Sequence, residues 1–138
     1  MWHDAGMRDD LDIPGDVDLD AVVRLLRASG ARFAFVHGSR PEGRARPGSD
    51  VDVAAWFGSP DVDTSGVVAD LPAGVDLLAL DTAPLELAGR VAMSGVLLFE
   101  NDPAERVAWQ ATTRKIYLDE RPRVDRARRD FVEARSRG

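Results

Sequence analysis

Short apolar runs alternate along this chain with segments in which apolar residues recur at helical spacing. The runs have the length and the flanking Gly, Pro or polar residues of β-strands, and they cover 31–37, 50–57, 74–80 and 96–100. Helical spacing or composition predicts helices over 16–30, 61–71, 84–93 and 103–118. The third run is apolar on both faces, which predicts a layer packed on each side of the sheet. Strands and helices in alternation indicate an α/β domain.

The N-terminal end of the chain, residues 1–16, is acidic and contains Pro14-Gly15, so we expect a flexible lead-in. A helix should begin near Asp16 or Asp18, because an aspartate there can cap free backbone N–H groups. Gly30 is a natural stop for that helix. Residues 17–138 are expected to form a single domain, since no linker is long enough to divide them.

The C-terminal part of the chain is predicted to be helical. Asn101-Asp102-Pro103-Ala104-Glu105 is a strong helix start, with Asp at the cap, Pro in the first turn and Glu three residues after the cap. This helix should run to about Leu118. Pro122 has no N–H group to donate, so it should interrupt or kink the helix. We expect 124–135 to form a further helix that is mostly exposed.

The composition excludes several classes of protein. With 138 residues, 44% hydrophobic and 30% charged, the chain is typical of one globular domain. No apolar run approaches the roughly 20 residues of a membrane span, and residues 1–10 lack the basic segment and apolar core of a secretory signal. The absence of cysteine excludes disulfides, thiolate metal sites and cysteine nucleophiles. We expect a cytoplasmic protein that does not bind membranes.

The net charge of −6 argues against a general nucleic-acid binder, which usually carries a basic surface. The charge is spread unevenly. Residues 1–20 hold seven aspartates against one arginine, whereas residues 119–138 hold seven arginines against five acids. Two interpretations of the basic end stay open: it forms a solvated surface, or it docks on an acidic partner.

Two carboxylates, Asp50 and Asp52, stand at the mouth of the second predicted strand. Side chains alternate faces along a strand, so both should point the same way, with Cα atoms about 6.6 Å apart. Such a pair is costly unless a cation lies between the carboxylates, and hard oxygen ligands suit Mg²⁺. Asp76, at the start of the third strand, is the candidate third acid. We expect these three acids to hold one or two Mg²⁺ ions.

Gly38-Ser39 ends the first predicted strand and is a candidate phosphate site. Glycine lets the backbone approach a phosphate closely, and serine adds a hydroxyl beside free N–H groups. Arg40, Arg44 and Arg46 could offset triphosphate charge, or they could face water as ordinary loop residues. Together with the acids, this stretch predicts in-line nucleotidyl transfer, in which Asp76 would help to deprotonate the acceptor.

Each of these signals has an ordinary explanation when it is taken alone. Asp-Val-Asp is commonly a strand-edge feature, Gly-Ser is commonly a turn, and Asp76 could be a capping or surface acid. Their combination across three strands favours the catalytic interpretation. His37, Trp56, Trp109 and Tyr117 are interpreted as packing residues, with His37 facing the helix layer or the loop. The chain has no P-loop motif, and neither histidine has a companion at zinc spacing.

The order Gly38-Ser39, ten residues, Asp50-Val51-Asp52 resembles the signature of the DNA polymerase beta-like nucleotidyltransferase superfamily. More closely, the chain looks like the minimal nucleotidyltransferases. The similarity continues through Val75-Asp-Leu-Leu and Val96-Leu-Leu-Phe-Glu-Asn-Asp to Tyr117-Leu-Asp. Over roughly residues 20 to 122, this pattern resembles the MntA-type antitoxins, which are partners of HEPN-domain toxins.

The resemblance implies a nucleotidyltransferase fold, in which helices flank a small mixed β-sheet and a helical extension follows. It also implies transfer of AMP from ATP to a tyrosine of a HEPN RNase toxin, with Mg²⁺ as cofactor, which silences the toxin within a hetero-oligomer. By position, Gly38 and Ser39 would bind the nucleotide phosphates, beside Arg40. Asp50, Asp52 and Asp76 would hold the metal.

Two other functions stay open. A non-catalytic antitoxin would block its partner by occlusion alone. A nucleotidyltransferase could instead modify a small molecule such as an aminoglycoside, although the chain is short for the added helical domain that would build such a pocket. The acidic balance disfavours transfer to an RNA end.

Overall fold

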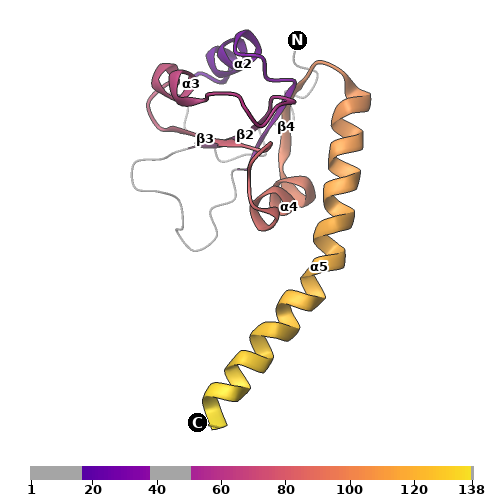
Figure 1. Cartoon of the computed structure of the whole chain (residues 1–138). Helices are drawn as coiled ribbons and strands as arrows, with labels where there is room; N and C mark the ends of the chain where they lie inside the picture. Colours follow the sequence, from indigo (N-terminus) through magenta and orange to yellow (C-terminus); the bar gives the residue numbers. More distant parts are fainter. Residues whose placement is uncertain (1–16, 38–50, 138) are drawn as a thin grey trace.

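A four-stranded mixed sheet in the order β3-β2-β1-β4 lies at the centre of the protein (Figure 1). The computed structural model describes residues 17–37 and 51–137. Strand β1 pairs in antiparallel fashion with β2 and β4, whereas β2 and β3 are parallel. In chain order the elements are α2 (Leu19–Ala28), β1 (Phe33–Val36), β2 (Val51–Trp56), α3 (Ser65–Asp70), β3 (Val75–Ala79), α4 (Leu85–Ser94), β4 (Val96–Glu100) and α5 (Pro103–Arg137). The predicted class, a small mixed sheet flanked by helices, is confirmed.

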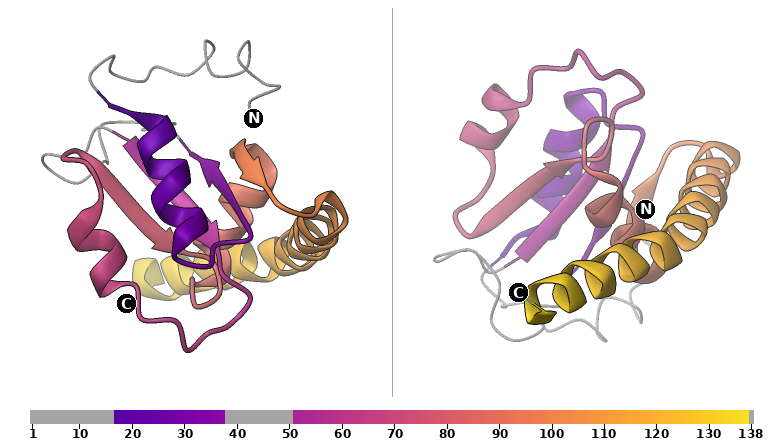
Figure 2. Two further views of the ribbon diagram at one scale, coloured as in Figure 1. Left: turned by 90° about the horizontal axis from the view of Figure 1, so that it is seen from above. Right: turned by 60° about the horizontal axis from the view of Figure 1, so that its bottom comes forward.

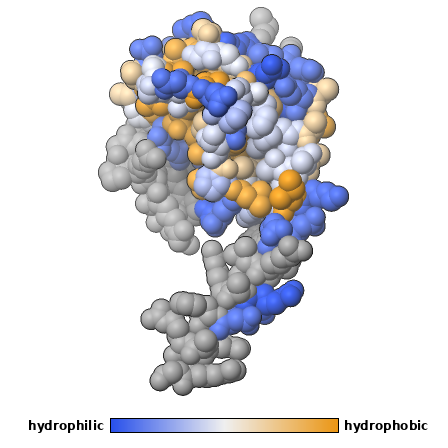
Figure 3. All heavy atoms as spheres, viewed as in Figure 1, coloured by the Kyte–Doolittle hydropathy of each residue, from blue (hydrophilic) through white to orange (hydrophobic). Residues whose placement is uncertain are grey.

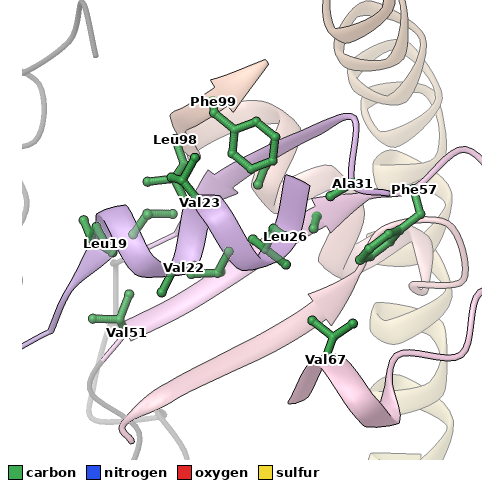
Figure 4. Packing of buried hydrophobic residues seen from close by; sticks show 14 residues of the cluster. Leu19, Val22, Val23, Leu26, Ala31, Val51, Phe57, Val67, Leu98 and Phe99 are labelled. Atoms are coloured by element: carbon green, nitrogen blue, oxygen red, sulfur yellow. The ribbon is translucent and has the colours of Figure 1, made fainter. Parts of the chain in front are cut away.

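Helices lie on both faces of the sheet, as the two-sided apolar pattern predicts. Helices α2 and α3 lie on one face, and α4 and α5 lie on the other (Figure 1, Figure 2). Alternate residues of β2 divide between the two layers. Val51, Val53 and Ala55 pack in the cluster under α2, in which Leu26 is fully buried (Figure 4). Ala54 belongs to the cluster on the opposite face.

Aromatic rings fill the second layer, where α5 begins. The ring of Trp109 lies 5.6 Å from that of Phe33 and 5.8 Å from that of Phe35, measured between centroids. Trp56 stacks on Phe33 at 6.1 Å with 12° between the ring planes. Aromatic pairs at these separations add to the stabilisation from burial alone. Trp56 and Trp109 are therefore packing residues, as predicted.

Both ends of α2 follow from local sequence signals. The Asp18 side chain accepts a hydrogen bond of 3.1 Å from the N–H of Ala21 and caps the first turn. At the other end, the N–H of Ala31 donates to the carbonyl of Leu26 at 2.9 Å, which is the long bond of a Schellman ending. Gly30 has a φ of 96°, which glycine adopts without steric cost. The predicted start near Asp18 and the stop at Gly30 are confirmed.

A carboxylate joins the turn after β2 to the end of β3. Asp81 accepts hydrogen bonds from the N–H groups of Phe57, Gly58 and Ser59, at 2.9, 2.8 and 3.0 Å respectively. Gly58 has a φ of 81°, so the turn depends on glycine there. Three donors to one carboxylate fix the direction in which the chain leaves the sheet.

The C-terminal helix α5 runs without a break from Pro103 to Arg137. The predicted end near Leu118 and the separate helix over 124–135 are therefore wrong. Of the two effects predicted for Pro122, interruption does not occur. The start of α5 is as predicted, because the Asp102 side chain accepts a 3.0 Å hydrogen bond from the N–H of Ala104. A proline removes one helical hydrogen bond and crowds the preceding turn. The Ala, Arg and Glu residues around Pro122 favour helix and keep it continuous. Figure 1 shows a change of direction about midway along α5, as a proline kink predicts.

The far half of α5 extends beyond the rest of the described protein (Figure 1). Arg126, Arg129 and Asp130 are exposed, in agreement with the predicted exposed extension. On the face drawn in Figure 3, hydrophilic residues predominate, with smaller hydrophobic groups between them. Within residues 17–37 and 51–137, no helix combines the length and the apolar character that a membrane crossing requires.

Candidate active site

Strands β2 and β3 bring two of the predicted acids together. In their parallel register Asp52 stands opposite Asp76, between the pairs Val51–Val75 and Val53–Leu77. Register partners of neighbouring strands lie on the same face, and adjacent strands are about 4.8 Å apart. The two carboxylates, 24 residues apart in the sequence, are therefore immediate neighbours. Asp76 lies at the start of a strand beside Asp52, where the sequence placed it.

A third polar side chain extends this row on the other side of Asp52. The N–H of His37 donates to the carbonyl of Asp52 at 3.0 Å, one step beyond the register pair Val36–Val53. Residues opposite each other in an antiparallel pair share a face. His37, Asp52 and Asp76 therefore form one row across the end of β1 and the starts of β2 and β3.

The row lies on the face of the sheet that carries the aromatic layer. Along β1, His37 is an even number of residues from Phe33 and Phe35, so the three share a face of the sheet. Along β2, Asp52 shares its face with Ala54 in the same way. Asp52 is half-buried, while Val51 and Val53 on the opposite face are buried. The prediction that these valines point into the core is confirmed. The acids thus stand at the margin of a packed layer rather than on an open surface.

Burial dominates the electrostatics of His37. Desolvation lowers the pKa of its imidazole below the usual value, although the negative charges of Asp52 and Asp76 act in the opposite direction. The ring is therefore neutral near pH 7. Its Nε2 atom is buried and has no hydrogen-bond partner among the described residues. Buried polar atoms in that state are uncommon and call for an explanation.

Sequence reasoning treated His37 as a packing residue and missed its place beside the acids. Of the two places predicted for its side chain, the helix layer or the loop, strand alternation favours the sheet face that carries Phe33 and Phe35. One signal could have indicated more: residue 37 directly precedes Gly38-Ser39 and has the same strand parity as the buried phenylalanines. A polar residue at such a position is placed on the covered face next to the predicted phosphate turn.

Several predicted site residues lie outside the described residues. These are Gly38, Ser39, Arg40, Arg44, Arg46 and Asp50, together with the expected lead-in 1–16. Their roles stay predictions. Within the described part of the chain, no group of three or more His, Cys, Asp or Glu side chains has the geometry of a metal site. Asp52 and Asp76 supply two adjacent carboxylates of the kind that binds Mg²⁺.

The sequence matches the family model "Polymerase beta, Nucleotidyltransferase" over residues 22–104. The match includes α2 from Val22 onward, all four strands, the row of His37, Asp52 and Asp76, and the first two residues of α5. No curated protein matches the sequence at a significant level.

The structure is similar to chains of solved toxin–antitoxin complexes. One complex contains AMP-PNP, and its chain has 18% identity and a TM-score of 0.66, with 84% of this chain and 99% of that chain covered. A chain of the MntA–HepT toxin–antitoxin has 18% identity and a TM-score of 0.63, with 83% and 96% covered. A complex of tri-AMPylated Shewanella oneidensis HEPN toxin with MNT antitoxin gives 19% identity and a TM-score of 0.64, with 83% and 95% covered. At these identities, the similarity establishes the fold.

Proposed function

This chain belongs to the polymerase beta nucleotidyltransferase family, and we propose that it transfers AMP from ATP to a tyrosine of a HEPN-domain RNase toxin and thereby neutralises that toxin. The observation that carries the proposal is the register of β2 and β3, which makes Asp52 and Asp76 neighbours on one face. Two adjacent, partly covered carboxylates favour a bound cation, and nucleotidyl transfer uses one.

The two acids fit a magnesium ion. Both offer carboxylate oxygens, and Mg²⁺ completes its shell with water and substrate phosphates rather than with a full set of protein ligands. Asp50, two residues before Asp52 in the sequence, is our candidate for a further ligand. Bound Mg²⁺ would offset the charge of the triphosphate and favour the ionised form of the acceptor hydroxyl.

The proposed reaction exchanges one bond at the α-phosphorus of ATP. The tyrosine oxygen bonds to that phosphorus, the bond to the oxygen bridging the α- and β-phosphates breaks, and pyrophosphate leaves with the electron pair. The tyrosine proton passes to a base, for which the Asp76 carboxylate is our candidate. Gly38, Ser39 and Arg40 are our candidates for holding the triphosphate in line.

The proposed partner is a HEPN toxin in a hetero-oligomer. The solved structures most relevant to this are toxin–antitoxin complexes, of which one holds AMP-PNP and another a tri-AMPylated HEPN toxin with MNT antitoxin. They support both the partner class and the transferred group. We place the reaction in the cytoplasm, where ATP is available.

Mass spectrometry of the partner tests the proposal. The protein is co-purified with a HEPN partner, incubated with ATP and Mg²⁺, and the partner is digested and sequenced. We expect AMP on a tyrosine of the partner, and none when the nucleotide or Mg²⁺ is left out. An unmodified partner under the full conditions would contradict the proposed activity.

A variant with both Asp52→Asn and Asp76→Asn separates catalysis from occlusion. Asparagine keeps the size of the side chain and removes its charge, so binding of the partner should persist while AMP transfer is lost. We expect this variant to fail to protect cells that express the toxin. Full protection without modification would instead support an antitoxin that acts by binding alone.

A further inference from the structure

The imidazole of His37 occupies the place in the row next to Asp52. Its backbone N–H donates to the Asp52 carbonyl at 3.0 Å, which fixes the end of β1 against the start of β2. Mg²⁺ held by Asp52 and Asp76 would complete its shell with substrate phosphates, so the side chain at position 37 would lie beside the bound triphosphate.

The chemistry of His37 differs from that of its neighbours. The carboxylates of Asp52 and Asp76 suit a cation, whereas the imidazole of His37 offers two ring nitrogens. It does not complete a three-ligand metal site with the acids within the described residues. A neutral imidazole can still donate one N–H and accept at its other nitrogen. Its remaining capacity is therefore hydrogen bonding.

The group of His37 that lacks a hydrogen bond within the described part of the chain is its Nε2 atom. It is buried and has no hydrogen-bond partner among the described residues, although the backbone N–H of the same residue is bonded to Asp52. Leaving such an atom unsatisfied costs stability, and natural structures retain the cost mainly where function uses the group. Rotation about the Cβ–Cγ bond, which has a broad torsional profile, can redirect Nε2 without moving the strand.

We propose that Nε2 of His37 donates a hydrogen bond to a phosphate oxygen of the bound nucleotide. This inference rests on the proposed function, because it concerns the same nucleotide. The anionic oxygen is a strong acceptor, and partial burial makes such a bond worth more than it would be at an open surface. His37 is then a nucleotide-binding residue that the apo protein keeps at a cost in stability.

Two substitutions at residue 37 test this. His37→Phe keeps a planar ring and removes the donor, whereas His37→Gln keeps an N–H donor at a similar distance from the backbone. Binding of a non-hydrolysable ATP analogue with Mg²⁺ is measured by calorimetry. We expect His37→Phe to weaken binding by about tenfold to a hundredfold, the usual effect of losing a hydrogen bond to a charged group. We expect His37→Gln to stay within about threefold of the wild type.

Two further measurements distinguish binding from a merely structural role. Inorganic triphosphate should lose affinity for His37→Phe by the same factor as the nucleotide, because the lost bond is to phosphate. The unfolding midpoint of the apo protein should rise in His37→Phe, because the unsatisfied atom is gone. His37→Leu provides a second apolar variant if the phenylalanine does not fit.

The outcomes are distinct. Equal nucleotide affinity in the wild type and both apolar variants overturns the inference and leaves the proposed function standing. If His37→Gln loses affinity as well, and the unfolding midpoint falls in every variant, then His37 is a packing residue. This result also overturns the inference. A wild-type protein that does not bind the analogue overturns the proposed function and this inference together.

Discussion

Gly89 on α4 lies directly against the ring of Tyr117 on α5. A Cβ atom added at residue 89 would overlap Cδ1 and Cγ of that ring, so only glycine lets the two helices approach this closely. One turn further along, the carbonyl of Ala92 accepts hydrogen bonds from Gln110 at 3.0 Å and from Arg114 at 2.6 Å. Helix α4 thus holds the near half of α5 through one close contact and two polar ones, and Tyr117 is a packing residue as predicted.

Gly89→Ala should destabilise the protein, because the new methyl group forces Tyr117 and α5 away from α4. Overpacking of this kind costs about 1–3 kcal/mol. Gly66→Ala is the matched control, since Gly66 is also helical and nothing lies within 4 Å of its added Cβ. There the better helix propensity of alanine should leave stability unchanged or raise it by up to about 1 kcal/mol.

Urea unfolding of the two glycine variants checks this difference. If the urea midpoints of both variants rise together, then Tyr117 moves aside at no cost. The close approach of α4 and α5 is then not needed for stability.

Asp81→Ala should also destabilise the fold, because three backbone N–H groups lose their common acceptor. Gly58 is exposed, so water can replace part of the interaction, and we expect a loss of about 1–2 kcal/mol. Asp81→Asn keeps one acceptor oxygen and should lose less. Thermal unfolding measures the effect, with Asp61→Ala, an exposed acid of the same loop, as control. Similar losses in both alanine variants would argue against a specific role for Asp81.

Much of the fold could be predicted because its signals are local. The cap at Asp18, the stop at Gly30 and the strand at 96–100 each depend on a few neighbouring residues, and each lies where the pattern predicted. Apolar residues on both faces of the third run correctly indicated two layers. The wrong helix end near Leu118 has a different origin, because a local rule about Pro122 was applied to a helix whose other residues favour continuation.

The site could be predicted only in part, because its geometry depends on pairing between strands. The sequence identified Asp52 and Asp76 as acids at strand starts, but not that they are register partners. The place of His37 beside them needs the antiparallel register of β1 and β2, which links residues 15 positions apart. The role of Asp81 needs a turn 22 to 24 residues earlier. Such relationships leave no periodic pattern in one sequence.

Stability should fall in acid through His37. Burial lowers the pKa of the folded imidazole from 6.5, against the opposing charges of Asp52 and Asp76, so the unfolded chain binds a proton that the folded protein resists. The loss of stability that comes from His37 is absent above about pH 7. It grows below about pH 6.5, by at most about 1.4 kcal/mol per pH unit.

Urea titrations from pH 8 to 5 on the wild type and His37→Gln isolate this effect, since all other groups are shared. The wild type should lose more stability in acid than the variant. Parallel pH profiles would show that the folded protein accepts the proton as readily as the unfolded chain.

Asp76→Asn should separate the metal response of the protein from its intrinsic stability. Like charges in register on neighbouring strands repel, so the apo protein should be as stable as the wild type or more stable by up to about 1 kcal/mol. Mg²⁺ that binds the folded wild type raises its unfolding temperature by mass action, and the variant should lose most of that rise.

Asp70→Asn, at the end of α3, is the control and should keep the rise in unfolding temperature. Thermal unfolding at increasing MgCl₂, with NaCl added to hold the ionic strength constant, makes the comparison. If the rise persists in Asp76→Asn, then Asp76 is not a ligand and the register of β2 and β3 has another purpose.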